Sequence, residues 1–323
     1  IALASGHYLA SGEYALVYLQ NSGLGNAINP LLSLADPEVY SIPMLLMIGW
    51  RGEPGYADEP QHVKQGRVTL SLLQAMEIPY VILETTTTDW QGVIKSACRQ
   101  MKDRQGPVAI VVKAGTFEPY QLDGQDEVAH LLTREQAIEI IIDELAEEDI
   151  IVSTTGKTSR ELFELRETRG QAHGGDFLTV GSMGHSSQIA LGVALQKPDR
   201  QVICLDGDGS VLMHTGALAI IGQMAPANLK HIVINNEAHD SVGGQPTASP
   251  NVDYVGVARA MGYKVATRAA IRDEVQNALR KMLDNEGPCL LEVRVKKGAR
   301  KDLGRPTTTP LQNRNDLMRR LAE

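Results

Sequence analysis

Short apolar runs alternate with longer amphipathic stretches along the first third of the chain. The apolar runs have the length and composition of buried strands and lie at residues 13–21, 42–50, 78–83 and 106–115. The opening residues 1–10 read as a helix, and further helix-like segments lie at 26–35, 62–76 and 90–103. This alternation predicts a parallel sheet with helices packed on both of its faces.

The pattern is lost at residues 115–134 and then resumes. Thr133 occupies the N-cap position of the next predicted helix, and Gln136 stands where it completes a capping box. Apolar runs follow at 149–156, 177–184, 201–209, 231–236, 263–267 and 288–295, with helices expected from about Ser159, Ser186 and Ser210 and a final short helix after a polar tail. The sequence therefore predicts two α/β domains, at residues 1–118 and 135–323, joined by a linker at 119–134.

Composition narrows the class of protein. The 323 residues are enough for two domains, and a net charge of −8 argues against a nucleic-acid partner. No apolar segment reaches the 18 residues of a membrane span. Cys98, Cys204 and Cys289 are too far apart for a zinc or iron–sulfur pattern, and isolated cysteines suit a reducing cytoplasm. We expect a cytoplasmic protein with no nucleic-acid or membrane partner, in which Cys204 and Cys289 are buried and inert.

Polar side chains mark the ends of two consecutive strands in the second series. Asp208 stands near the end of the run at 201–209, and Asn235 and Asn236 end the run at 231–236. In a right-handed βαβ unit both strand ends lie at the same edge of the sheet, beside the start of the helix that joins them. Carboxylate and amide oxygens suit Mg²⁺ or Ca²⁺, and a helix N-terminus offers N–H groups to an anion. This arrangement predicts a site for a metal-bound diphosphate.

Other motifs that share these residues fail in detail. A dinucleotide fingerprint starting at Gly207 needs glycine where Leu212 stands, and a calcium loop starting at Asp206 needs glutamate where Ala217 stands. The segment TTGKTS, residues 154–159, resembles the end of a phosphate loop but lacks its first glycine, since Ile151 is there. Because these three motifs do not fit, a metal–diphosphate site remains the interpretation of these residues.

Gly207-Asp208-Gly209, followed after residues 210–234 by Asn235-Asn236, resembles the signature of thiamine diphosphate-dependent enzymes. Longer phrases, among them QNSGLGNAINPLLSLADPEVY, TVGSMGHSSQIALG, NNEAHDSVGGQPT and RKDLGRPTTTP, are similar to the phosphonopyruvate decarboxylase family. The resemblance covers nearly the whole chain. It implies two thiamine diphosphate-binding-type domains: a pyrimidine-binding domain at 1–118 and a diphosphate-binding domain at 135–323. It also implies at least a homodimer, because the cofactor of such enzymes lies between domains of two chains.

The resemblance assigns roles to individual residues. It implies that the Asp208 carboxylate, the Asn236 side chain and the Ala238 carbonyl bind Mg²⁺. Further residues implied to contact the cofactor, chiefly its diphosphate, are Thr155, Gly156, Thr158, Gly209 and Ser210. Met183 corresponds to an apolar wedge beneath the bent cofactor, and the Gly181 carbonyl faces the cofactor's amino group. Methionine at such a position would otherwise be read as a core residue.

The implied reaction is decarboxylation of the 2-oxo acid 3-phosphonopyruvate to phosphonoacetaldehyde and CO₂, a step of phosphonate biosynthesis. The glutamate that activates the cofactor in this superfamily corresponds to a position before Ile1, so we expect that an N-terminal part of the first domain is missing from this sequence. His185 and His239 flank the cofactor motifs, and either is a candidate proton donor or a structural histidine.

Recognition of a phosphonate needs cationic or N–H donors. Residues after two strand tips of the first domain are candidates for the substrate pocket: Asn21, Ser22, Gly23, Arg51 and His62. Arg51 fits equally well as a surface residue paired with Glu53 or Asp58. The alternatives that stay open are a sulfopyruvate or other 2-oxo acid decarboxylase, and a non-catalytic thiamine diphosphate-binding protein if the glutamate is truly absent.

Overall fold

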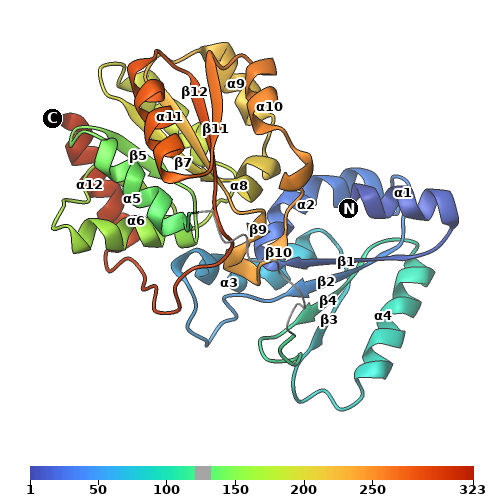
Figure 1. Cartoon of the computed structure of the whole chain (residues 1–323). Helices are drawn as coiled ribbons and strands as arrows, with labels where there is room; N and C mark the ends of the chain where they lie inside the picture. Colours follow the sequence, from blue (N-terminus) through green and yellow to red (C-terminus); the bar gives the residue numbers. More distant parts are fainter. Residues whose placement is uncertain (121–131) are drawn as a thin grey trace. The chain divides into compact units, whose positions relative to one another are not determined.

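The computed structural model describes residues 1–120 and 132–323, so most of the predicted linker, residues 121–131, lies outside the described residues. The chain divides into two compact units, Ile1–Gln121 and Leu122–Glu323, each an α/β layer structure (Figure 1). No helix in these two stretches is long and apolar enough to span a membrane. The predicted fold class, parallel sheets with helices on both faces, is confirmed.

The first unit contains a four-stranded parallel sheet in the order β1-β2-β4-β3. Its strands are β1 Ala15–Gln20, β2 Met44–Gly49, β3 Tyr80–Leu83 and β4 Val108–Val112, and its helices are α1 Ala2–Ser11, α2 Leu24–Pro30, α3 Pro60–Ala75 and α4 Trp90–Arg104. Alternate residues of β2 and β4 enter two separate apolar cores. One core packs against α2 and α3, and the other packs against α4.

The second unit contains a six-stranded parallel sheet in the order β11-β12-β8-β7-β5-β6. Its strands are β5 Ile150–Ser153, β6 Asp176–Leu178, β7 Val202–Gly207, β8 Leu229–Asn235, β11 Val265–Ala269 and β12 Cys289–Arg294, with a two-residue pair β9 Ala238–His239 and β10 Gln245–Pro246 beside the sheet. Helices α5 Arg134–Glu144, α6 Lys157–Thr168 and α11 Arg272–Asp284 cover one face. The other face is covered by α7 Ser186–Gln196, α9 Ala217–Met224, α10 Tyr254–Ala260 and α12 Pro310–Ala322.

Several local predictions can be compared with the structure. The capping box at Thr133 and Gln136 is present, and α7 begins at Ser186 as expected. The helix expected from about Ser159 begins at Lys157, and the one expected from Ser210 is the short α8 Asp208–Met213. The predicted helix at 26–35 changes to a wider π-helical turn at Leu31–Ala35, directly after Pro30. The strand expected at 177–184 ends at Leu178, because Thr179 onward forms the loop that leads to α7.

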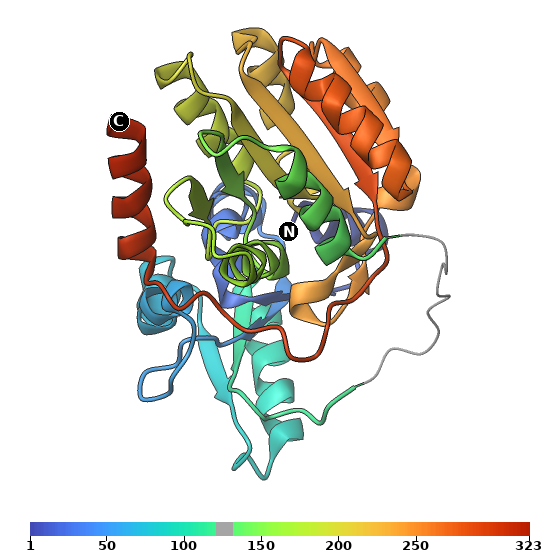
Figure 2. The same cartoon turned by 60° about the vertical axis from the view of Figure 1, so that its left-hand side comes forward.

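The segment after β12 joins the sheet to the last helix. Arg160 of α6 donates hydrogen bonds to the carbonyls of Leu303 and Gly304, and the Gly304 N–H donates to Glu164. Figure 2 shows this segment running past α6 to α12. A second capping box, between Thr309 and Gln312, starts α12. These hydrogen bonds hold residues 303–304 against α6.

Candidate cofactor and metal site

The two strand ends that carry Asp208 and Asn236 are neighbours in the sheet. Strands β7 and β8 are parallel, with Gly207 paired to Ile234. The N–H groups of Gly209 and Asn236 both act as hydrogen-bond donors to the Asp208 carboxylate. The structure therefore brings together the two residues that the sequence analysis placed at one edge of the sheet.

The Asp208 carboxylate is buried but has only neutral partners. Its Oδ2 accepts hydrogen bonds from Thr247 Oγ1 and Ser249 Oγ, both at 2.6 Å, and Asp208 is 2% exposed. Burial raises the pKa of Asp208, although the two hydroxyl groups oppose the shift. Within residues 1–120 and 132–323, no lysine or arginine forms an ion pair with it. A buried carboxylate without a cationic partner is an oxygen ligand that suits a hard cation.

The two asparagines have different partners. Asn235 Nδ2 donates to Glu292 at 2.8 Å, and its Oδ1 accepts from the Glu237 N–H at 3.1 Å, so Asn235 ties β8 to β12. Asn236 Nδ2 donates to Asp240 Oδ2 at 2.7 Å, and its Oδ1 accepts from the Ala238 N–H at 3.2 Å. Glu237 adopts a left-handed backbone with φ of 57°, which bends the chain sharply between Asn236 and Ala238. Asn236 is thus the asparagine at the edge near Asp208.

The start of α8 is lined by small residues and by Met183. Ser210 Oγ accepts a hydrogen bond from the Gly184 N–H at 3.0 Å and one from Thr154 Oγ1 at 3.1 Å. A Cβ atom on Gly209 would lie 2.8 Å from the His239 ring and 3.3 Å from Met183 Cε. Met183 and His239 are therefore both packed against Gly209, where a larger residue would not fit.

The remaining cofactor candidates lie around the start of α6 and in the loop before α7, in the same unit. Gly156 precedes α6 with φ of 98° and faces Ser241, while Thr158 is buried in the first turn of α6. Thr155 and Gly181 are half-buried. Among all the cofactor candidates, Gly209 packs against Met183, and Ser210 is hydrogen-bonded to the loop before α7.

The two candidate histidines have different environments. The His239 ring packs against Gly209. His185 is exposed, its ring meets the His214 ring edge-on with centroids 4.5 Å apart, and its Nδ1 lies 3.1 Å from the Ser182 carbonyl. Of the two, His239 is the histidine that lies against the predicted diphosphate loop.

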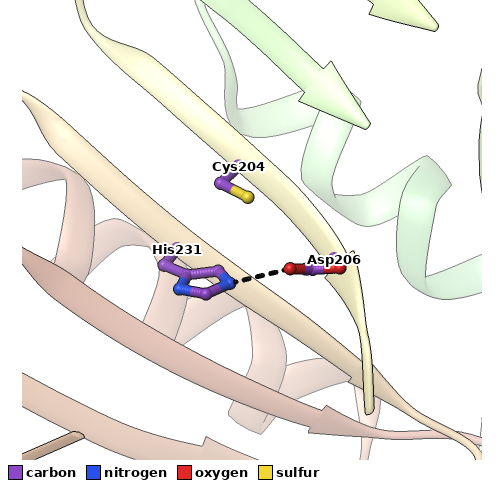
Figure 3. Close-up of side chains that lie close together, drawn as sticks. All are labelled: Cys204, Asp206 and His231. Carbon is purple, nitrogen blue, oxygen red and sulfur yellow. Dashed lines mark ion pairs between the residues drawn. The ribbon is translucent and has the colours of Figure 1, made fainter. Parts of the chain in front are cut away.

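A buried polar cluster beneath the strand edge was not predicted. Cys204, Asp206 and His231 lie on neighbouring strands β7 and β8, with ligand-type atoms within 4.8 Å of one another (Figure 3). His231 Nε2 is 3.4 Å from Asp206 Oδ2, and its Nδ1 is 3.0 Å from the Tyr263 hydroxyl. Burial acts to raise the pKa of Asp206, but His231, Ser210 and the Gly207 N–H outweigh it and hold the pKa below its usual value. Asp206 therefore stabilises the turn at Gly207 by accepting a hydrogen bond from the Gly207 N–H.

Cys204 and Cys289 are buried, as predicted, and all three cysteines are free thiols. Burial raises the pKa of Cys204 well above its usual value, so the thiol is kept protonated. Four further residues of this site were also missed by the sequence analysis: Thr247, Ser249, Asp240 and Arg134. Asp240 lies four residues after Asn236, but the other three reach the site only through the tertiary fold.

The substrate candidates in the first unit form a second group. Asn21 is 5% exposed and holds the backbone of Arg51, with Nδ2 donating to the Arg51 carbonyl at 2.8 Å and Oδ1 accepting from its N–H at 3.1 Å. The Arg51 guanidinium forms a bidentate ion pair with Asp58, the alternative considered above, whereas Glu53 pairs with Lys113. Asp58 also accepts from the Gly52 and Glu59 N–H groups.

His62 lies beside this ion pair. It is 8% exposed, and its Nδ1 has no hydrogen-bond partner among the described residues. Burial, followed by the charge of Arg51, lowers the pKa of His62. Ser22 instead donates to Gln20 at 2.6 Å, and Gly23 ends a short 3₁₀ turn. The structure groups Asn21, Arg51 and His62, and turns the Ser22 hydroxyl toward Gln20.

Comparison with known proteins places this geometry in a family. Residues 154–293 match the model described as thiamine pyrophosphate enzyme, C-terminal TPP binding domain, where thiamine pyrophosphate is another name for thiamine diphosphate. The fold, the strand-edge site and this match define a thiamine diphosphate-dependent enzyme.

The relatives narrow the class further. Phosphonopyruvate decarboxylases from Streptomyces viridochromogenes and Streptomyces hygroscopicus are 38% and 37% identical to the chain. The alignments cover 96% and 100% of the chain, and 80% and 81% of the two relatives. A sulfopyruvate decarboxylase from Methanosarcina acetivorans is 29% identical over 87% of the chain and 75% of that relative. The chain belongs to the phosphonopyruvate decarboxylase family.

Proposed function

We propose that this protein decarboxylates 3-phosphonopyruvate to phosphonoacetaldehyde and CO₂, using thiamine diphosphate and Mg²⁺. The observation that carries the choice of substrate is the identity of 37–38% over nearly the whole chain to two phosphonopyruvate decarboxylases, against 29% to the sulfopyruvate enzyme. Sulfopyruvate is the second candidate substrate, because it differs only in the anionic group.

In this proposal the second unit holds the diphosphate end of the cofactor. Asp208, the Asn236 side chain and the Ala238 carbonyl would bind Mg²⁺, a role supported by the buried, cation-free carboxylate of Asp208. Gly209, Ser210, Thr155, Gly156 and Thr158 would contact the diphosphate, with Gly181 and Met183 against the rest of the cofactor. Thiamine diphosphate supplies the electron sink into which the electrons of the broken carbon–carbon bond pass as CO₂ leaves.

The chain's own residues would then position the substrate and supply a proton. The first unit, proposed as the pyrimidine-binding unit, offers Arg51 for the phosphonate, with its backbone fixed by Asn21. Arg51 would exchange the Asp58 carboxylate for the phosphonate, since a guanidinium binds either group in a bidentate way. His62 would border this group. His239, packed against Gly209, is the better placed proton donor, with His185 as the alternative.

A homodimer or larger homo-oligomer completes the proposal. It is supported by the family resemblance and by exposed apolar side chains of the first unit, such as Leu3, Leu16 and Tyr18. We place the enzyme in the cytoplasm on the strength of its free cysteines. Sedimentation equilibrium tests the assembly, and a monomer at micromolar concentration would contradict it.

The test of function is CO₂ release by the full-length protein from 3-phosphonopyruvate and from sulfopyruvate, with and without Mg²⁺ and cofactor. We expect release from 3-phosphonopyruvate only when both are present, and a lower kcat/KM for sulfopyruvate. Preference for sulfopyruvate would reject the proposed substrate, and no CO₂ from either acid would reject the decarboxylase. Asp208→Ala should abolish cofactor binding in calorimetry, and unchanged affinity would reject the metal site.

A further inference from the structure

A buried network of charged groups lies directly behind Asn236. Three donors converge on Asp240 Oδ2: Asn236 Nδ2 at 2.7 Å, Arg134 Nη1 at 3.0 Å and the Gly298 N–H at 3.0 Å. The side chains of Arg134 and Asp240 are 5% and 6% exposed. Asp240 is therefore fixed by its neighbour Asn236 and by two residues far away in sequence, Arg134 and Gly298.

Every nitrogen of the Arg134 guanidinium has a partner within this network. Its Nε and Nη2 bind the two carboxylate oxygens of Glu161 at 2.7 and 2.9 Å, Nη2 also donates to the Gly298 carbonyl at 3.2 Å, and Nη1 binds Asp240. Glu161 is 1% exposed. Because every nitrogen of the guanidinium already has a partner, Arg134 holds Asp240 in place and does not itself recognise an anion.

Asp240 determines which way the Asn236 amide faces. Oδ2 of Asp240 must accept, because all three groups around it are donors, so the NH₂ group of Asn236 has to point toward it. The Asn236 carbonyl oxygen then faces away from Asp240. That oxygen accepts one hydrogen bond, from the Ala238 N–H at 3.2 Å, and keeps a second lone pair.

The charge of the network also favours a cation at that oxygen. Two carboxylates, Asp240 and Glu161, share one guanidinium, and the Asp240 carboxylate also accepts from the NH₂ group of Asn236. A carboxylate bonded to the NH₂ side of an amide draws positive charge there and makes the carbonyl oxygen a stronger donor to a metal.

We propose that Asp240, held by Arg134 and Gly298, is a positioning residue that presents the Asn236 carbonyl oxygen to Mg²⁺. The proposal rests on the Mg²⁺ site of the proposed function and adds the group that orients one of its ligands. Removing a hydrogen-bond partner of a metal ligand weakens metal affinity about 10- to 100-fold.

Two substitutions separate the charge of Asp240 from its hydrogen bonds. Asp240→Asn removes the charge but keeps an oxygen that can accept from Asn236, so the Mg²⁺ concentration needed for half-maximal thiamine diphosphate binding should rise about 10-fold. Asp240→Ala removes the acceptor as well and should raise it toward about 100-fold. Calorimetric titration of cofactor at a series of Mg²⁺ concentrations measures both changes.

Glu237→Gln is the matched control. Glu237 belongs to the same loop and carries the same charge, but its carboxylate pairs with Arg294 at a partly exposed position. The side chains of Glu237 and Arg294 are 35% and 44% exposed. We expect its Mg²⁺ dependence to stay within about twofold of the native protein, because a partly exposed pair is weak and screened. At saturating Mg²⁺ the Asp240 variants should bind one cofactor per chain, as the native protein does; a merely structural defect would lower that stoichiometry at every Mg²⁺ concentration.

Other outcomes of the Mg²⁺ titration would overturn the proposal or reject the function on which it rests. Mg²⁺ dependence within twofold of native in both Asp240 variants would overturn the proposal, and so would a loss as large as that of Asp208→Ala, which would make Asp240 a direct ligand. If Asp240→Ala fails to fold, judged by circular dichroism, Asp240→Asn decides alone. Failure of the native protein to bind Mg²⁺ and thiamine diphosphate would instead reject the proposed function on which this inference rests.

Discussion

Two arginines, one in each unit, bind a carboxylate through two nitrogens, but their surroundings differ. Arg51 has a side chain that is 42% exposed, and its partner Asp58 is 12% exposed. Arg134 and its partner Glu161 are 5% and 1% exposed. An exposed guanidinium can leave its carboxylate for an anionic ligand at little cost, whereas a buried one cannot leave without stranding a charge. Burial therefore separates an arginine suited to recognition from one suited to holding other residues in place.

The backbones of the two arginines are both fixed. Asn21 binds the N–H and the carbonyl of Arg51, and a capping box at Thr133 starts the helix in which Arg134 is the first residue. The difference lies only in the side chains. Arg51 can change partner while its main chain stays still, which limits the entropy lost when it binds a ligand.

The largest effect should come from removing the buried arginine. Arg134→Met leaves the carboxylates of Glu161 and Asp240 buried without their cation, and we expect a loss of about 3–5 kcal/mol in the free energy of unfolding. Urea denaturation followed by circular dichroism measures it. Arg280→Met is the control, because Arg280 is 60% exposed and pairs with Glu144 at the surface, so its loss should stay below about 1 kcal/mol. Equal losses in the two variants would break the comparison.

The sequence could predict one of these pairs but not the other, and separation along the chain explains why. Asp58 lies 7 residues from Arg51 in the same loop, so the pair was visible as an alternative. Glu161 and Asp240 lie 27 and 106 residues from Arg134. No local pattern connects them, although the neighbouring Thr133 was predicted as an N-cap from local residues alone.

The same reasoning applies to the strand edge. Asp208 and Asn236 could be placed together because the βαβ rule depends only on element order. Thr247 and Ser249, which bind Asp208, follow a loop whose course depends on glycines in left-handed conformations, Gly243 and Gly244. Such a course cannot be read from periodicity, since it depends on tertiary contacts. The fold was therefore predictable in outline, whereas the partners of the site residues were not.

The second prediction tests the exposed arginine. Arg51→Met should lower kcat/KM for 3-phosphonopyruvate about 10- to 100-fold, because a hydrogen bond to a charged group contributes about 1.5–3 kcal/mol. The free energy of unfolding should fall by less than about 1 kcal/mol. Steady-state kinetics and urea denaturation measure the two quantities. Arg67→Met, at an exposed position of α3, is the control that should change neither. Unchanged kcat/KM in Arg51→Met would leave Arg51 as a surface residue paired with Asp58.

The smallest effect concerns pH. The hydrogen bond from Arg51 lowers the pKa of Asp58 and, with the Glu59 and Gly52 N–H groups, outweighs the opposing effect of burial. A carboxyl whose pKa is lower in the folded state stabilises the fold above its unfolded pKa of about 3.9, and this contribution is lost as pH falls through the folded value. Because Arg51 is substantially exposed, we expect it to be about 1 kcal/mol at most.

Asp58→Asn isolates this contribution. At pH 7 the variant should unfold at a lower urea concentration than the native protein, and the gap should narrow as the pH is lowered from about 5 toward about 2, since the native protein loses the stabilisation that the variant never had. The variant should also bind the substrate no more weakly than the native protein, because the arginine no longer has a competing carboxylate. A gap that stays constant with pH would show that Asp58 acts through its neutral hydrogen bonds to the loop, and the exposed pair would then resemble the buried one in holding structure.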